Sequence, residues 1–478
     1  MYDVAIIGAG VIGGMIAREL SLYGIKICLL EKENDVAMGA TKANSAIVHA
    51  GFDAKEGTLK AKLNVRGSKM MPRIARELGV KYVNNGSLVV GFNEEDEKTL
   101  EVLLQRGNSN GVEGLRLLNR EEILEIEPNI GKKVTCALYA PTGAIVCPYD
   151  LAVSAIGNAM DNGAELKCNF EVKSIENENE CYIIKSEKEE ISARYVINCA
   201  GVYSDKIARL TGDDSFNVHP RRGEYVLLDK ECGDIISHTM FVTPSKMGKG
   251  ILVSPTVDGN LLLGPTAVDI EDKADKSVST EFFSSIFDVA ERSVSNIPKN
   301  KTITSFCGLR SVGSTGDFII NSPRKGFINV AGIESPGLSA SPAIAEHVRD
   351  ILKGEGLSLI RNENAKTTRR SMHAFRDADV DEKNRMIKEN PSYGRIVCRC
   401  EGVTEGEILD AIHTNPKATD LDGVKRRTRS QMGRCQGGFC SPYIIELLSK
   451  ELNLPYEKIT KFGKESYVAT GKTKEMRK

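Results

Sequence analysis

Tryptophan is absent from the sequence, histidine occurs only six times in 478 residues, and 64 lysines and arginines nearly balance 65 acidic residues. Without a basic excess, holding nucleic acid is excluded as the main role. No run approaches the ~18 consecutive apolar residues of a membrane span. The N-terminal segment Met1–Gly14 lacks the basic start and cleavage site of a signal peptide. We therefore expect a cytoplasmic protein without its own membrane span, peripheral to a membrane only through a partner.

The chain has 12 cysteines, and the reducing cytoplasm disfavours disulfides. Eight of them are scattered singly over the first 310 residues, as expected of small core side chains. The others, Cys398, Cys400, Cys435 and Cys440, form two close pairs near the C-terminus. At ~150 residues per domain the length indicates about three domains. The clustered cysteines therefore mark a separate C-terminal domain.

The N-terminus has the pattern of a βαβ unit, with a strand at Asp3–Ile7, a helix at Val11–Tyr23 and a strand at Lys26–Leu30. Gly8, Gly10 and Gly13 form G-x-G-x-x-G at the first turn, where glycines allow a tight turn and close approach of a pyrophosphate. Glu31 ends the second strand, and its carboxylate suits ribose hydroxyls. The segment predicts a dinucleotide site.

The dinucleotide is expected to be FAD, because two distant glycine-marked returns, Asn198–Gly201 and Ala331–Gly337, suit a long flavin cofactor. The sequence has no second G-x-G-x-x-G of this quality, which argues against a separate NAD(P)H domain. It also has no cysteine pair in the helix after Glu31, which argues against a flavin disulfide reductase. Thr41, Asn44 and Ser45 are short polar residues suited to pyrophosphate or flavin edges. The complete set of expected FAD contacts is Gly8, Gly10, Gly13, Glu31, Thr41, Asn44, Ser45, Val172, Ala200, Gly201, Gly332, Gly337 and Leu338.

Several separate blocks resemble the D-amino acid oxidase superfamily of FAD-dependent oxidoreductases, and most closely its glycerol-3-phosphate oxidases and dehydrogenases. These blocks lie, in the same order, at Ala40–Asp53, Gly248–Pro255, Gly264–Ala267, Gly308–Ile320 and Glu334–Ala343. The resemblance covers roughly Met1 to Gly354. Related 2-hydroxyglutarate oxidoreductases share the N-S-x-x-x-H-x-G pattern, so it leaves open the choice between a phosphorylated and a carboxylated alcohol.

The resemblance implies an α/β fold, with a Rossmann-like FAD-binding domain, an inserted antiparallel-sheet substrate domain and a small α-rich C-terminal iron–sulfur domain. The expected oxidoreductase domain is 1–362, with FAD-binding parts near 1–80, 140–212 and 305–362 and a substrate lobe near 81–139 and 213–304. A polar linker at 363–394, a cluster domain at 395–455 and a basic tail at 456–478 follow.

Oxidation of a secondary alcohol requires a base for the hydroxyl proton and a clamp for the anionic end. His49 is the candidate base, because the resemblance puts its loop against the isoalloxazine ring. Arg310 is the candidate anion clamp, with Lys249 as a second anion contact or a solvated loop lysine. Ser335 is expected near flavin or substrate. Arg221 and Arg222 suit a salt-bridged strand start equally well as substrate binding.

The four C-terminal cysteines have the spacing C-x-C, 34 residues, C-x4-C, which suits an iron–sulfur cluster or zinc. Structural zinc commonly uses C-x2-C, which neither pair has. The segment resembles the [2Fe-2S] domain of bacterioferritin-associated ferredoxin, found also in anaerobic glycerol-3-phosphate dehydrogenases. The nearby Lys425, Arg426, Arg427, Arg429 and Arg434 suit docking of an acidic electron carrier, raising of the cluster potential, or a solvated helix face.

These patterns together predict FAD-dependent oxidation of glycerol 3-phosphate to dihydroxyacetone phosphate, with electrons passing through the cluster to an electron-accepting protein subunit. The first alternative is the same chemistry on a 2-hydroxy acid such as 2-hydroxyglutarate, with Arg310 holding a carboxylate. The second alternative is a flavin and iron–sulfur electron-transfer subunit without a substrate of its own.

Overall fold

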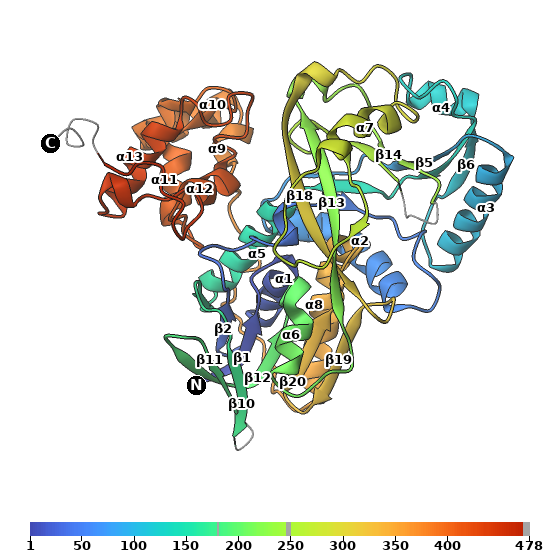
Figure 1. Cartoon of the computed structure of the whole chain (residues 1–478). Helices are drawn as coiled ribbons and strands as arrows, with labels where there is room; N and C mark the ends of the chain where they lie inside the picture. The colour runs from blue at the N-terminus through green and yellow to red at the C-terminus, as the bar shows by residue number, and fades with distance from the viewer. Residues whose placement is uncertain (179–180, 245–249, 472–478) are drawn as a thin grey trace.

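A computed structural model describes residues 1–178, 181–244 and 250–471. Figure 1 shows three regions: a sheet with helices around the N-terminus, a second sheet beside it, and a separate helical domain at the C-terminal end. Among the described residues no helix combines the length and apolarity needed to cross a membrane.

The N-terminal sheet is built on three parallel strands, β1 (Tyr2–Ile7), β2 (Ile27–Leu30) and β12 (Glu190–Asn198). Continuous burial of β2 on both faces explains its unbroken apolar sequence Ile-Cys-Leu-Leu. The remaining strands of this sheet are β9 (Glu165–Lys167), β10 (Ser174–Glu178), β11 (Cys181–Lys185), β19 (Ile319–Arg324) and β20 (Phe327–Ala331). The sheet therefore collects strands from positions more than 300 residues apart in the chain.

Four helices accompany this sheet: α1 (Val11–Leu20), α2 (Leu59–Glu77), α5 (Pro148–Asp161) and α8 (Gly337–Gly354). Helix α1 packs against both α5 and α8, and α8 packs against α2. Their apolar faces and the sheet form the largest core, in which Ile6, Ile16, Leu29, Ile156 and Ile344 are fully or almost fully buried. This core fixes the start of α1 and the start of α8 in one region.

The second sheet has nine strands and depends on a long antiparallel pair, β13 (Val218–Leu228) and β18 (Thr302–Gly313). Figure 1 shows this pair running between the two sheets. The other strands are β5 (Ser87–Gly91), β6 (Arg116–Asn119), β7 (Cys136–Ala140), β14 (Thr239–Val242), β15 (Leu252–Pro255), β16 (Leu261–Gly264) and β17 (Val268–Asp269). A small third sheet contains β3 (Ile47–Val48), β4 (Tyr82–Val83) and β8 (Ala144–Val146).

Two features of the second sheet differ from the sequence expectation. The boundary expected at 305 falls inside β18, which pairs with β13 along its length and so belongs to this sheet. The sheet is also not wholly antiparallel, because β14 runs parallel to β5. These two strands lie about 150 residues apart in the chain, far enough for the crossover that a parallel pair needs. The accompanying helices are α3 (Glu94–Ser109), α4 (Arg120–Ile126) and α7 (Thr280–Ala290), whereas α6 (Ser204–Arg209) packs on β12 and β20 of the first sheet.

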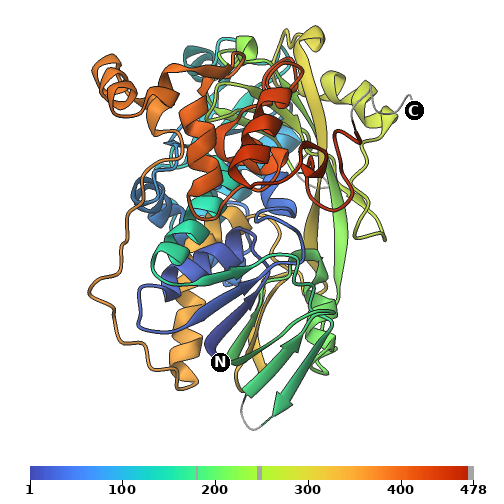
Figure 2. The ribbon, with the colours of Figure 1, turned by 90° about the vertical axis from the view of Figure 1, so that its left-hand side faces the viewer.

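The connection between α8 and the C-terminal domain lies along the outside of the first domain, where Figure 2 shows it as an extended orange segment. Its backbone bonds to that domain, since Asn362 N donates to Leu22 O at 2.9 Å and Arg369 N donates to Glu77 O at 2.7 Å. The second half of the expected polar linker is instead folded. It contains α9 (Ala374–Asp377) and α10 (Val380–Glu389), and Phe375 stacks on Tyr393.

The C-terminal domain is mostly helical, as expected. It contains the short strands β21 (Ile396–Cys398) and β22 (Val403–Thr404) and the helices α11 (Glu405–His413), α12 (Leu421–Thr428) and α13 (Ser441–Glu451). Ile408, Ile412, Val424, Ile444 and Leu448 form its separate buried core. Because the core is its own, the position of this domain depends on side-chain contacts with the rest of the chain.

Candidate active site and cluster site

The glycine loop after β1 is tightly packed against the end of β12. Gly8 has φ +108°, and a Cβ on Gly8 would lie 2.4 Å from Cys199 O. A Cβ on Gly13 would lie 2.0 Å from Gly8 O, so only glycine allows α1 to start this close to the loop. The N-cap residue of α1, Gly10, has no side chain to cap the helix, and of the first N–H groups Val11 N donates to Thr41 Oγ1 at 3.0 Å. The other N–H groups at the start of α1 and its positive dipole therefore suit a pyrophosphate.

Glu31 follows β2 and is held against the same loop. Its Oε2 accepts from Ala9 N at 2.9 Å and its Oε1 accepts from Glu33 N at 3.0 Å. Burial raises the pKa of Glu31, and these two backbone hydrogen bonds oppose that rise. A carboxylate fixed in this position beside the start of α1 suits the ribose of a dinucleotide.

Two of the predicted cofactor residues hold the loop at 40–49 in place, Thr41 by a bond to α1 and Asn44 by bonds within the loop. Thr41 Oγ1 accepts from Val11 N at 3.0 Å. The Asn44 amide donates to Ala40 O and Thr41 O at 3.1 and 2.9 Å, and its Oδ1 accepts from Ala46 N at 2.8 Å. Both side chains therefore shape the loop beside the glycine turn.

His49 lies at the end of this loop, between the first turn of α8 and the second sheet. Its Nε2 is 3.2 Å from Ser335 Oγ, and its backbone N donates to Ser339 Oγ at 2.7 Å. Its ring faces Phe241 of β14 with centroids 5.7 Å apart. A small pocket lined by His49, Phe52, Asp53, Val89, Leu103, Phe241, Val242 and Pro244 opens beside the imidazole. The structure therefore joins two predicted catalytic residues that are 286 positions apart.

Arg310 is in β18, a strand that passes close to the loop at 40–49. A Cβ on Gly308 would lie 1.9 Å from Ala43 O, which shows how closely the strand and the loop approach. Arg310 Nη2 donates to Thr266 O at 2.7 Å. This bond orients the partly exposed guanidinium, which has further donors that suit an anion.

Tyr225 links Arg310 to the loop and received no firm role from the sequence. Its ring is buried and stacks on Phe306 at 4.9 Å, and its hydroxyl is 3.3 Å from Ser45 Oγ. Burial raises the pKa of Tyr225, and the Arg310 charge opposes that rise. Phe241 was missed entirely, because an aromatic residue in an apolar strand has no pattern that separates a site from a core. Arg221 and Arg222 instead pair with Asp269 and Asp275, as strand-start salt bridges.

The other predicted cofactor residues lie at three places. Gly337 and Leu338 open α8, whose N-cap residue provides no side-chain cap. Val172 and Ala200 are partly buried against one apolar cluster of the first sheet. Gly201 and Gly332 follow β12 and β20, with φ +58° and +62°. Lys249 lies outside the described residues.

The four clustered cysteines form two pairs. Cys400 Sγ and Cys435 Sγ are 3.5 Å apart. A hydrogen bond from Cys440 lowers the pKa of Cys398 to about 6 and raises that of Cys440. The described residues hold no group of three or more acidic, histidine or cysteine side chains arranged around one ion. Two pairs are the donor set for a [2Fe-2S] cluster, in which each iron takes two thiolates.

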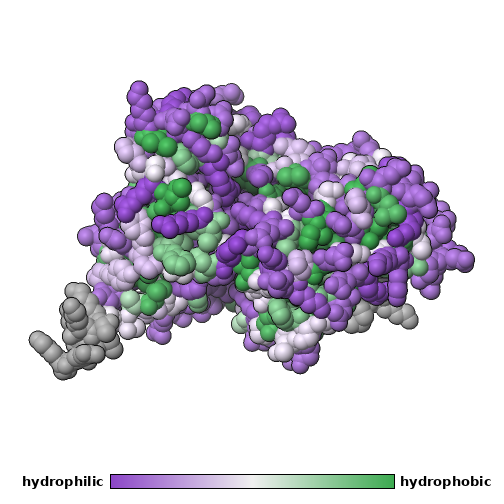
Figure 3. Space-filling view, turned by 90° about the horizontal axis from the view of Figure 1, so that it is seen from above, coloured by the Kyte–Doolittle hydropathy of each residue, from purple (hydrophilic) through white to green (hydrophobic). Residues whose placement is uncertain are grey.

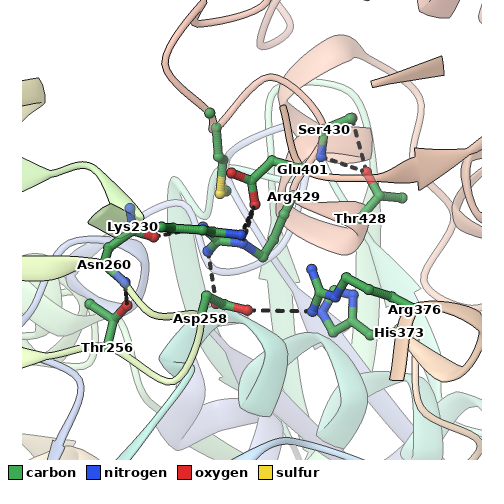
Figure 4. Close-up of polar contacts among 12 residues, drawn as sticks. Lys230, Thr256, Asp258, Asn260, His373, Arg376, Glu401, Thr428, Arg429 and Ser430 are labelled. Atoms are coloured by element: carbon green, nitrogen blue, oxygen red, sulfur yellow. Dashed lines mark hydrogen bonds and ion pairs between the residues drawn. The ribbon is translucent and has the colours of Figure 1, made fainter. Parts of the chain in front are cut away.

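Arg429, at the end of α12, connects the cluster domain to the rest of the chain (Figure 4). It is almost fully buried, and its guanidinium bonds to Asp258 at 2.8 Å, Glu401 at 3.1 Å and Asn260 at 3.2 Å. It also donates to Tyr149 Oη at 3.2 Å. Glu401 directly follows the ligand Cys400, so this network fixes the loop that carries Cys400 on the oxidoreductase domain (residues 1–362, hereafter the flavin domain).

The predicted basic cluster mostly faces inward. Arg427 bonds to both carboxylate oxygens of Asp35, at 2.9 and 2.8 Å, and Arg426 contacts the same carboxylate. All three are buried. Neither carrier docking nor a solvated face, two of the sequence interpretations of these residues, holds for Arg426, Arg427 and Arg429. Buried partners on the flavin domain take up their charge.

The fold and site thus define a dinucleotide-binding oxidoreductase with an added four-cysteine domain. The chain belongs to the family described as FAD dependent oxidoreductase, which matches residues 3–351. Residues 396–450 match the BFD-like [2Fe-2S] binding domain. The cofactors are therefore FAD and a [2Fe-2S] cluster, and not zinc. The glycine cradle, the starts of α1 and α8 and the paired thiols fit these two groups.

Three comparisons are the most informative. A protein of Caloramator mitchellensis named glycerol 3-phosphate dehydrogenase is 49% identical over 99% of both chains. The FAD-bound L-alpha-glycerophosphate oxidase of Mycoplasma pneumoniae has a TM-score of 0.73 and 31% identity, covering 77% of this chain and 98% of that one. Human mitochondrial L-2-hydroxyglutarate dehydrogenase is 34% identical over 56% of this chain and 61% of its own.

Proposed function

We propose that this enzyme oxidises sn-glycerol 3-phosphate to dihydroxyacetone phosphate, and that the electrons leave through the [2Fe-2S] cluster to a protein acceptor. The observation that carries the proposal is the relative named glycerol 3-phosphate dehydrogenase, which matches nearly the whole chain, including the cluster domain. The oxidase neighbour has the flavin part only, which is consistent with a separate role for the added domain.

In the proposed mechanism His49 takes the proton from the substrate hydroxyl. Ser335 Oγ, 3.2 Å from Nε2, orients the imidazole, and the Ser339 hydroxyl holds its backbone. A positioned base of this kind contributes ~10²–10⁴ to a rate. When the hydroxyl proton is removed and the hydride leaves the alcohol carbon, that carbon becomes a carbonyl.

The substrate phosphate is proposed to bind Arg310, with Lys249 as a second anion contact. Thr266 O holds one end of the Arg310 guanidinium, and Tyr225 is buried beside it. A guanidinium oriented in this way provides paired donors of the right geometry for a phosphate or carboxylate. The clamp thus places the alcohol carbon relative to His49.

FAD, when bound, would supply the hydride acceptor, and the [2Fe-2S] cluster would supply one-electron transfer. The start of α1 would hold the pyrophosphate and Glu31 the ribose. The flavin end would be lined by the start of α8, with Gly337 and Leu338, and by the loop that contains Thr41, Asn44 and Ser45.

A second candidate is a 2-hydroxy acid dehydrogenase, favoured by the L-2-hydroxyglutarate dehydrogenase relative. Arg310 would then hold a carboxylate in place of a phosphate. That relative matches only 56% of this chain, whereas the glycerol 3-phosphate relative matches 99%. We therefore propose glycerol 3-phosphate, and not a 2-hydroxy acid, as the substrate.

Anaerobic reduction of the bound flavin, followed at its visible absorbance, tests the proposal. We expect glycerol 3-phosphate to bleach the flavin fully and 2-hydroxyglutarate to leave it oxidised. Bleaching by the hydroxy acid alone would transfer the assignment to the second candidate. If neither substrate bleaches it, the chain is an electron-transfer subunit.

A further inference from the structure

Phe439 is the most exposed large apolar side chain among the described residues, with 86% of its surface accessible. It lies between the ligands Cys435 and Cys440. Its loop is held in place, because Gly438 N donates to Cys435 O at 3.0 Å and Ser441 Oγ donates to Gly437 O at 2.7 Å. The fold therefore presents this aromatic ring to solvent beside the cluster.

Phe439 is more exposed than the next large apolar side chains in the described residues, Met1 at 76% and Ile360 at 74%. On the face shown in Figure 3, apolar residues form small separate spots in a mostly hydrophilic surface. Aromatic residues are enriched at the centres of protein interfaces, where one buried ring carries much of the affinity. Ile396, also exposed, lies two positions before the ligand Cys398.

Three exposed arginines lie near the cluster ligands in the chain, and one of them is unpaired among the described residues. Arg399, between the ligands Cys398 and Cys400, is exposed and has no ion pair or hydrogen bond within the described part of the chain. Arg395 is exposed and lies over Tyr443, with Glu405 3.3 Å away. Arg434, next to Cys435, is also exposed and reaches Asp229 and Glu231. An acidic surface would complement this face.

We propose that Phe439, Ile396 and Arg399 form the docking surface for a one-electron acceptor protein with an acidic face. This inference rests on the proposed route of electrons through the cluster. The Cys400–Cys435 pair, at 3.5 Å, reaches the surface here, because Cys400 is exposed and Cys435 partly so. A partner seated on Phe439 would therefore meet the cluster at its accessible edge.

Electrons balance with two dockings for each substrate. Oxidation of one alcohol to a ketone releases two electrons and two protons. Each acceptor takes one electron at the cluster, so two acceptor proteins are reduced, and both protons pass to solvent.

Binding to the anaerobic holoenzyme tests the surface without substrate or turnover. The probes are rubredoxin, a small acidic one-electron protein, and basic cytochrome c, each measured by biolayer interferometry. We expect rubredoxin to bind more tightly. Phe439→Ala should weaken its binding by about 10-fold or more. Arg399→Glu should also weaken binding and flatten its salt dependence, and Arg399→Lys should restore it.

Phe283→Ala is the matched control, because Phe283 is an exposed phenylalanine on α7. It should leave rubredoxin binding unchanged. The visible and electron paramagnetic resonance spectra of the cluster must match the parent in every variant, which shows that the loop is intact. The inference would be overturned if both Phe439→Ala and Arg399→Glu bound rubredoxin as tightly as the parent protein does. It would also be overturned if cytochrome c bound the parent protein more tightly than rubredoxin does. Failure of the proposed substrate would appear separately, as an unbleached flavin.

Discussion

Replacing Arg429 with methionine should loosen the cluster domain from the flavin domain. The guanidinium is buried between Asp258 and Glu401, whose side chains are 8% and 2% exposed. Methionine keeps much of the side-chain volume and leaves two buried carboxylates with one cation fewer. Those carboxylates come from different domains, so the loss acts at the interface between them.

The magnitude follows from what remains at each carboxylate. Breaking a buried ion pair costs ~3–5 kcal/mol. Asp258 keeps Arg376 at 3.4 Å and Glu401 keeps Lys230 at 2.9 Å, so we expect the lower end. About 3 kcal/mol corresponds to roughly a 10²-fold larger opened population.

Amide hydrogen exchange across α12 and residues 255–260 measures this opening. Exchange there should quicken by roughly 10²-fold in Arg429→Met, while the cores of β1 and β2 keep their protection. The control is Arg434→Met, because the Arg434 pairs with Asp229 and Glu231 are exposed and worth ~0–1 kcal/mol. Equal exchange in the two variants would refute the assignment of Arg429 as a fastening of this domain.

The pH dependence has a defined sign. Burial raises the pKa of Asp258, but Arg429 and Arg376 more than offset it, so the net shift is downward. A carboxyl with a lowered folded-state pKa stabilises the fold above its unfolded value near ~3.9, and this stabilisation is lost as the pH falls through the folded value. The difference between Arg429→Met and the parent should therefore be full at pH 7 and shrink below about pH 4.

Three further outcomes follow from the site. His49→Ala should slow anaerobic flavin reduction by ~10²–10⁴, measured by stopped-flow, whereas the exposed His219→Ala should not. Arg310→Met should raise the substrate concentration needed for half-maximal reduction, since each lost charge-assisted hydrogen bond is worth ~1.5–3 kcal/mol; an unchanged value would remove Arg310 from the anion site. Cys400→Ser should abolish acid-labile sulfide and transfer to protein acceptors but leave single-turnover flavin reduction near the parental rate. The control Cys181→Ser should retain the acid-labile sulfide and the transfer to protein acceptors. Finding one zinc and no iron in the parent protein would contradict the cluster.

The sequence was sufficient where the signal is local. The glycine turn after β1, Glu31 after β2 and the first helix follow from periodicity and from residues that only certain backbones accept. The segment expected as a helix at Val11–Tyr23 is α1 at Val11–Leu20. The four cysteines were equally clear, because their clustering has no role in a reduced core.

The candidate site was predicted residue by residue but not as an arrangement. Sequence motifs selected His49, Ser335 and Arg310, yet only the fold brings His49 to Ser335 across 286 positions. Phe241 and Tyr225 enter the site from strands whose patterns indicate only burial. Their roles depend on which element packs opposite, and a pattern within one strand carries no information on that.

The tertiary structure alone decided the place of the basic residues in the cluster domain. A charge run at helical spacing indicates a solvated face or a docking face, because burying a cation is costly unless a partner meets it. The partner of Arg426 and Arg427 is Asp35, about 390 positions earlier in the chain. The sequence determined that the chain has a nucleotide-binding loop and a four-cysteine cluster site, since a short motif specifies each of them. The fold determined how they face each other, since that depends on contacts between residues far apart in the sequence.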